Sequence, residues 1–152
     1  MRLASNDFAD GGKIPRACTC DGEDLSPALS WSGSPAEAGC FALLCNDPDA
    51  PVGIWRHWAV YDMPGGVAAL PRGAGRPAGS QTFKQAINDF RSAGYGGPCP
   101  SRGHGGHHCR FLLLALSVER VPVPSGARCL DVERAAFKHA LAEALLVGTY
   151  VR

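Results

Sequence analysis

Two acidic residues and two histidines are the candidate functional side chains of this sequence, judged by residue type and spacing. Asp47 and Asp49 follow an apolar run, His57 comes shortly after them between two tryptophans, and His107 opens a second apolar run. Imidazoles change charge near neutral pH, and two of them beside loop N–H groups suit an anion. If the strands that carry them are neighbours, Asp47, His57 and His107 converge on one small polar pocket.

The same residues also have purely structural interpretations. Asp47 and Asp49 could form Asx-turns at a strand exit, and His57 could be a satisfied core histidine. His104 is interpreted as a loop residue, and His108 as a residue that faces away from the pocket, because side chains alternate along a strand.

Three short apolar runs supply the strands that would position these residues. Phe41–Cys45 and His57–Asp62 flank the acidic loop, and Arg110–Leu116 follows the glycine-rich loop 94–106. Alternation predicts that His57, Ala59 and Tyr61 share one face of their strand. Glycine and proline number 19 and 12, which favours a turn-rich β protein.

One helix is predicted near the C-terminus, over residues 131–146. Asp131 is the expected N-cap, and Phe137, Leu141 and Leu145 recur at four-residue spacing before Gly148 ends the helix. The predicted fold is therefore mostly β and antiparallel, with a C-terminal helix packed against the sheet.

The composition restricts the function further. The 152 residues suffice for one domain, residues 1–152, and a net charge of +1 gives no field for nucleic acid. No apolar stretch is long enough to span a membrane, and the N-terminus has no signal peptide, so a cytoplasmic location is expected. The seven cysteines include no CxxC pair, and most are expected to be reduced and buried.

Several motifs in the same order resemble the phosphatidylethanolamine-binding proteins, in particular their bacterial Raf kinase inhibitor-like branch. The resemblance runs essentially end to end. It is carried by SND near the N-terminus, LSPALSWSGSP, DPDAP, His57-Trp58, NDFRSAGYGGPCPSRGHGGH and the closing LLVGTY.

This resemblance implies a two-sheet antiparallel β-sandwich with a small anion pocket and no cofactor, metal or catalytic residue. In the family the loop usually ends His-Arg-Tyr, whereas here it reads His107-His108-Cys109. Cys109 is therefore expected where a tyrosine hydroxyl would donate, and Ser101 replaces a usual proline. The expected ligand-binding residues are Asp47, Asp49, His57, Pro98, Cys99, Pro100, Ser101, His107 and Cys109.

The implied ligand is a phosphate, an acetate or a phosphoethanolamine-like group. A phosphorylated protein partner and a role in kinase regulation follow from the eukaryotic members, and a homodimer follows from the bacterial branch. Neither nucleic acid nor integral association with a membrane is expected.

Two alternative functions use the cysteines. A metal site could draw ligands from the group His104, His107, His108 and Cys109, to which Cys18 and Cys20 could add thiolates, although no four-ligand zinc spacing is present. A thiol enzyme or redox protein could use Cys109 or Cys99 as nucleophile, with His107 or His57 as base and Asp47 to orient it.

Overall fold

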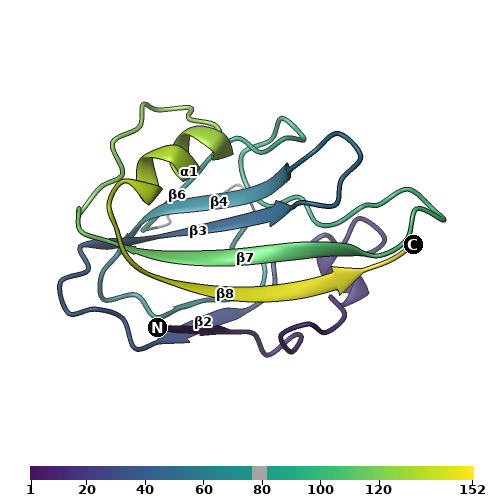
Figure 1. The fold of residues 1–152 in the computed structure, drawn as a ribbon, viewed down its shortest axis with the longest axis horizontal. Coiled ribbons are helices and arrows are strands. Elements are labelled where there is room, and N and C mark those ends of the chain that lie inside the picture. Colours follow the sequence, from purple (N-terminus) through teal and green to yellow (C-terminus); the bar gives the residue numbers. More distant parts are fainter. Residues whose placement is uncertain (77–81) are drawn as a thin grey trace.

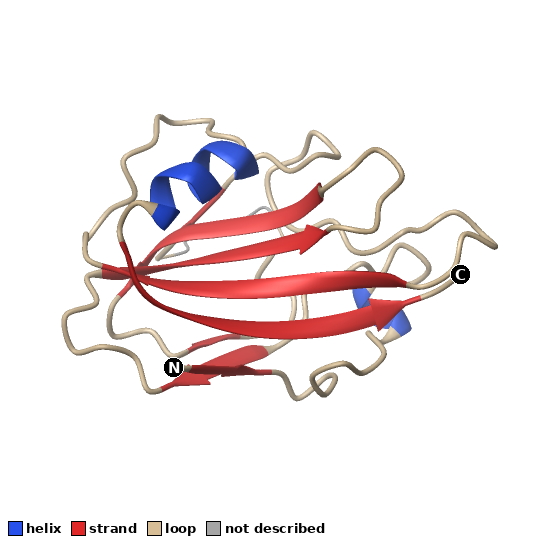
Figure 2. Cartoon of the chain, in the orientation of Figure 1, coloured by secondary structure: helices blue, strands red, loops and turns tan. Residues whose placement is uncertain are grey.

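The computed structural model describes residues 1–76 and 82–152 and has two antiparallel sheets with one α-helix on the outside (Figures 1 and 2). In the smaller sheet the order is β1-β2-β5, and in the larger it is β6-β4-β3-β7-β8. The predicted two-sheet β fold with a helix in the C-terminal region is confirmed. The elements are β1 (Arg2–Ala4), a 3₁₀ turn (Arg16–Cys18), β2 (Leu29–Ser32), β3 (Cys40–Asp47), β4 (Trp55–Pro64), β5 (Ala69–Leu70), β6 (Lys84–Gln85), β7 (His107–Leu116), α1 (Cys129–Phe137) and β8 (Ala140–Tyr150).

Strands β3 and β4 of the larger sheet are buried on both faces of that sheet. Trp58 and Val60 belong to the core between the two sheets, while Ala59 and Tyr61 pack beneath α1. Strand β3 is apolar on both faces for the same reason: one face meets the small sheet and the other meets the helix.

The alternation predicted for β4 is correct from Trp58 to Tyr61 but wrong for His57. A register shift between β3 and β4 turns Arg56 toward Glu133 of α1, and His57 instead joins Asp47 and His107 in one pocket.

The helix predicted over residues 131–146 is wrong in its second half. Helix α1 ends at Phe137, and the chain from Ala140 forms β8, which pairs antiparallel with β7. Asp131 is the third helical residue rather than the N-cap, and its Oδ2 accepts the backbone N–H of Arg128 at 2.9 Å. Alanine, leucine and glutamate favour a helix locally, but the ladder with β7 decides the conformation.

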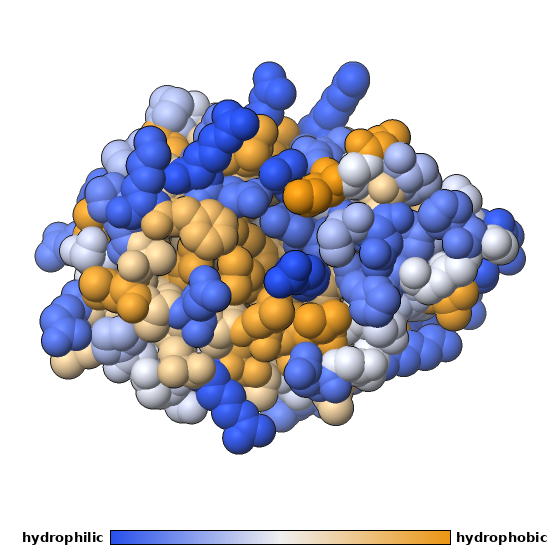
Figure 3. All heavy atoms as spheres, in the orientation of Figure 1, coloured by the Kyte–Doolittle hydropathy of each residue, from blue (hydrophilic) through white to orange (hydrophobic). Residues whose placement is uncertain are grey.

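The four-residue spacing of Phe137, Leu141 and Leu145 wrongly indicated a helix, because Leu141 and Leu145 belong to strand β8. Its buried residues alternate with exposed ones, and Leu141 and Leu145 are 45% and 42% exposed on the face beside α1. Together with Phe137, they contribute to the apolar surface that Figure 3 shows over β7 and β8. In the described residues, no helix is both long and apolar enough to cross a membrane.

Three strand ends of the larger sheet meet at one end of the molecule. Strand β3 ends at Asp47 and β4 begins opposite it at Trp55, while β7 begins at His107 on the other side of β3. Figure 1 shows the connecting loops gathered at this end, close to the C-terminus. The topology therefore places the acidic loop and both histidines next to each other.

Candidate functional site

A small pocket of about 210 Å³ opens at this end of the larger sheet. Pockets for drug-sized ligands usually measure about 300–1,000 Å³, so this one suits a smaller group. Its walls come from the end of β3, the loop into β4, the start of β4, the start of β7 and the segment before β7. The lining residues are Asp47, Ala50, Pro51, Val52, Trp55, His57, Phe90, Cys99, Pro100, Ser101 and His107.

The structure brings most of the predicted site residues to this pocket and leaves three outside its wall. Asp49 pairs with β7 on the outside, Pro98 lies in the strand-like segment behind the wall, and Cys109 lies in the core. Those that line the pocket are Asp47, His57, Cys99, Pro100, Ser101 and His107.

Asp47 and His107 form a buried pair across β3 and β7. The Nδ1 of His107 lies 2.6 Å from Oδ2 of Asp47, and the two side chains are 4% and 6% exposed. Because a carboxylate only accepts, Nδ1 of His107 carries the proton. The other carboxylate oxygen of Asp47 accepts the backbone N–H of Asp49 at 2.7 Å. Asp47 is thus fully engaged in orienting His107 and the loop.

His57 presents a neutral imidazole. Its Nδ1–H donates to the carbonyl oxygen of Gly96 at 2.7 Å, and its Nε2 is buried without a partner in the described residues. Burial lowers the pKa of His57 below the ordinary value of a histidine, and the bond to Gly96 offsets part of this. At neutral pH the empty pocket therefore contains an unused lone pair on Nε2.

Trp55 is a further residue of the pocket wall. Its indole Nε1–H is buried, and within the described parts of the chain it has no acceptor. Phe90 packs edge-on against both Trp55 and His57, with ring centroids 5.3 and 5.5 Å away. Among the described residues, the Nε1–H of Trp55 is thus a donor without a partner and Nε2 of His57 an acceptor without one. Both rings line the same pocket and pack against Phe90.

His104 is not a simple loop residue. Its Nδ1 lies 2.9 Å from Nε2 of His107, and the two ring centroids are 5.1 Å apart. A chain of hydrogen bonds therefore connects Asp47, His107 and His104. Nothing in the sequence separates His104 from the neighbouring polar residues of this loop.

Asp49 and His108 join the acidic loop to β7 on the outside of the pocket. Oδ2 of Asp49 accepts from the backbone N–H of His108 at 2.9 Å and lies 2.6 Å from its Nδ1. The hydrogen bond from the His108 side chain lowers the pKa of Asp49. His108 points to solvent, as predicted, and its pairing with Asp49 fixes the position of the loop.

Cys109 is fully buried between the sheets beside Cys45. Burial, followed by hydrogen bonding to the Cys109 thiol, raises the pKa of Cys45. The described free cysteines are all buried, which opposes thiolate formation and gives no support to the thiol-enzyme alternative. No cluster of three or more metal-ligating side chains occurs within residues 1–76 and 82–152.

A disulfide that the sequence did not predict ties one wall of the pocket to the N-terminal segment. Cys20 and Cys99 are bonded, with a sequence separation of 79 and Cα atoms 5.4 Å apart. Arg152 reinforces this wall by donating to Sγ of Cys99 at 3.6 Å and to the Pro100 carbonyl at 3.4 Å. The prediction of buried, reduced cysteines holds for the other five.

Gly97 lets the pocket wall approach the N-terminal segment closely. Its N–H donates to Oδ1 of Asp24 at 2.8 Å, and a Cβ at this position would lie 2.5 Å from the same oxygen and also against the Cys18 carbonyl. We expect Gly97→Ala to lower the free energy of unfolding by about 1–3 kcal/mol, because backbone atoms must shift to admit the methyl group.

Urea denaturation would measure this effect, with Gly66→Ala as the matched control. A Cβ on Gly66 meets no atom within 4 Å, and its backbone does not need a positive φ. Equal losses in the two variants would show that the close approach at Gly97 is unimportant.

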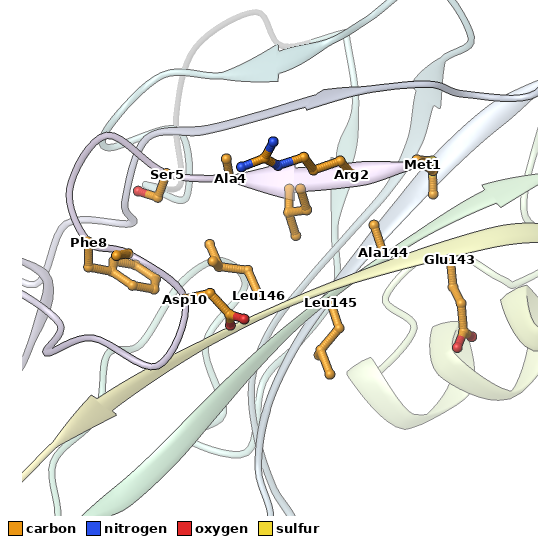
Figure 4. Close-up of a pocket in the computed structure, with 12 residues that line it drawn as sticks. Met1, Arg2, Ala4, Ser5, Phe8, Asp10, Glu143, Ala144, Leu145 and Leu146 are labelled. Atoms are coloured by element: carbon orange, nitrogen blue, oxygen red, sulfur yellow. The ribbon is translucent and has the colours of Figure 1, made fainter.

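A larger groove of about 710 Å³ lies elsewhere, between the open edges of β1 and β8 (Figure 4). Figure 4 shows the polar side chains of Arg2 and Glu143 pointing away from each other, while Phe8 and Leu146 fill the space between the strands. Because its polar groups do not converge, this groove is a weaker candidate than the smaller pocket, despite its size.

Comparison with known proteins places the chain among related sequences and structures. The profile of the family described as phosphatidylethanolamine-binding protein matches residues 4–151. UPF0098 proteins of Aquifex aeolicus and Methanothermobacter thermautotrophicus are 43% and 44% identical over 152 and 156 residues, covering 100% of this chain and 89% and 99% of those proteins. The crystal structure of Escherichia coli YbcL matches with a TM-score of 0.93 at 34% identity, covering 99% of this chain and 98% of that one. The likeness therefore spans both sheets.

Proposed function

The chain belongs to the phosphatidylethanolamine-binding protein family, and from this premise we propose that it is a binding module for a small phosphate- or carboxylate-bearing group. The ligand would occupy the 210 Å³ pocket, with Trp55 and His57 as its direct contacts. Asp47 would orient His107, which forms a further wall of the pocket, and no catalytic residue is assigned.

One observation carries this proposal: two buried ring nitrogens in the same pocket have no partner among the described residues. Trp55 offers a donor in its Nε1–H, and His57 offers an acceptor in its Nε2. Buried polar groups are nearly always hydrogen-bonded, so a ligand is the natural partner for both. A monoprotonated phosphate has an oxygen that accepts and a hydroxyl that donates. A fully ionised group would instead be met by a protonated His57.

The same chemistry covers the partners expected from the sequence. A phosphoethanolamine head group and a phosphorylated side chain both present a phosphate monoester or diester on a flexible stem. The aliphatic and aromatic rim supports a ligand with an apolar attachment, since Val52 and Phe90 are 78% and 43% exposed beside the pocket. The phosphoprotein partner, the kinase role and the homodimer remain predictions.

The location is proposed on a separate observation. Cys20 and Cys99 form a disulfide and both are exposed to solvent. Because cytosolic thiols are kept reduced, this disulfide favours an oxidising compartment over the cytoplasm expected from the sequence.

The pH dependence of anion affinity tests the binding proposal. Burial lowers the pKa of His57 in the empty pocket, and a bound anion would raise it again by favouring the imidazolium. Binding therefore takes up a proton, and affinity should rise by up to about tenfold per pH unit as pH falls, until His57 is already protonated in the empty protein.

Sulfate is the preferred probe, because it keeps its charge throughout this pH range. Calorimetric titration from pH 8 to pH 5.5 would give the slope, and His57→Gln is the control because glutamine does not titrate. An affinity that stays constant over this range in the wild type would refute the role of His57. A slope that persists in His57→Gln would equally show that His57 does not take up the proton.

A further inference from the structure

The nitrogen of His107 that could face an anion already has a partner. Asp47 engages Nδ1 of His107 at 2.6 Å, which leaves Nε2 as the only ring nitrogen available to a ligand. His104 engages that Nε2 through its own Nδ1 at 2.9 Å. In the empty pocket, both nitrogens of His107 are therefore satisfied by the protein.

The direction of these bonds decides what an anion would meet. With its proton on Nδ1, a neutral His107 has only a lone pair on Nε2, so the Nδ1–H of His104 donates to it. An anion needs a donor at this position. It can gain one only if Nε2 of His107 carries a proton and His104 no longer occupies that nitrogen.

The position of His104 allows it to leave. His104 is exposed whereas His107 is 3% exposed, so turning His104 out buries no new polar group. It lies between Gly103 and Gly105, whose φ values of 76° and 96° suit glycine, and a Cβ on either would meet no atom within 4 Å. The loop around His104 thus has room for a change of conformation.

We propose that His104 competes with the bound anion for Nε2 of His107 and so sets the affinity of the pocket. This inference rests on the proposed function and adds to it a residue that controls the same site. Without a ligand, His104 occupies Nε2 of His107, while Nε1 of Trp55 and Nε2 of His57 have no partner among the described residues. A ligand that contacts all three rings must displace His104.

The test compares sulfate and inorganic phosphate affinities of the wild type with those of His104→Ala, His104→Asn and His139→Ala. His104→Ala removes the competitor, and we expect binding about fivefold tighter, which corresponds to one ordinary hydrogen bond. The asparagine variant keeps an N–H that can donate to Nε2, so its affinity should stay near that of the wild type. His139 lies at the end of α1, away from the pocket, and its variant should not differ.

Imidazole ¹⁵N chemical shifts give a readout that a purely structural role would not change. In His104→Ala without ligand, the chemical shift of His107 Nε2 should move toward the value of a nitrogen with a free lone pair. In His104→Asn it should return toward the wild-type value. If the wild type binds and His104→Ala binds equally or more weakly, the competition is refuted while the anion pocket stands. If neither anion binds to any variant, the proposed function itself fails and takes this inference with it.

Discussion

Loss of the Cys20–Cys99 disulfide is expected to lower the free energy of unfolding by about 4 kcal/mol. The bond closes a loop with a sequence separation of 79 residues, which restricts the unfolded chain strongly. It joins the N-terminal segment to the wall of the pocket, where the backbone N–H of Cys20 also donates to the Pro98 carbonyl at 3.4 Å. Both cysteines are exposed, so a dithiol can reach and reduce the bond in the folded protein.

Denaturant unfolding with and without a dithiol would measure this loss, and the double variant Cys20→Ser with Cys99→Ser is its control. The double variant should match the reduced wild type and should not respond to the dithiol. Anion affinity should fall in both, because Cys99, Pro100 and Ser101 line the pocket. Equal stability of the oxidised and reduced protein would contradict the prediction.

Counting the reactive thiols would show whether the bond forms in cells. Alkylation of the denatured, unreduced protein should label five cysteines, and prior reduction should expose all seven. Labelling of all seven in protein trapped directly from cells would instead support the cytoplasmic location predicted from the sequence.

The strands could be predicted from the sequence because their signals are local. The apolar runs Phe41–Cys45 and Arg110–Leu116 lie inside β3 and β7. Each strand of the structure is a few residues longer than the run that predicted it. The segment 140–150 could not be assigned in the same way. Its alanines and leucines fit a helix and a strand equally well, and only the pairing with β7 decides between them.

The pocket was predictable where residue type and strand position agree. Asp47, His57 and His107 stand at the ends of three adjacent strands, so the topology alone brings them together. Cys109 shares the buried face of His107, as alternation requires, but it lies one step deeper, where a short thiol remains in the core. The described pocket wall therefore has neither the tyrosine hydroxyl usual in the family nor the Cys109 thiol that was expected in its place.

Trp55 shows what sequence reasoning could not supply. A tryptophan beside a buried histidine is usually a packing residue, and its N–H becomes informative only when its surroundings contain no acceptor. The same holds for the disulfide, since connectivity among seven cysteines depends on which chain segments meet in space. Both features depend on contacts between distant parts of the chain.

Trp55→Phe should weaken binding of phosphate or sulfate by roughly ten- to a hundredfold. The substitution removes the Nε1–H, and with it a hydrogen bond to a charged ligand, but keeps an aromatic ring against Phe90. Because this N–H has no partner in the described part of the empty protein, its removal breaks no internal hydrogen bond. The loss should therefore appear in affinity and much less in stability.

Trp31→Phe provides a matched control, since Trp31 also has a buried Nε1–H without a described partner. Trp31 lies in β2 and packs against Phe41 in the core between the sheets, so its variant should bind as the wild type does. Calorimetric titration of both variants, with unfolding curves beside them, separates a lost contact from a damaged fold. Equal affinity of Trp55→Phe and the wild type would mean that the indole does not touch the anion. The ligand would then have to be held by His57 and His107 alone.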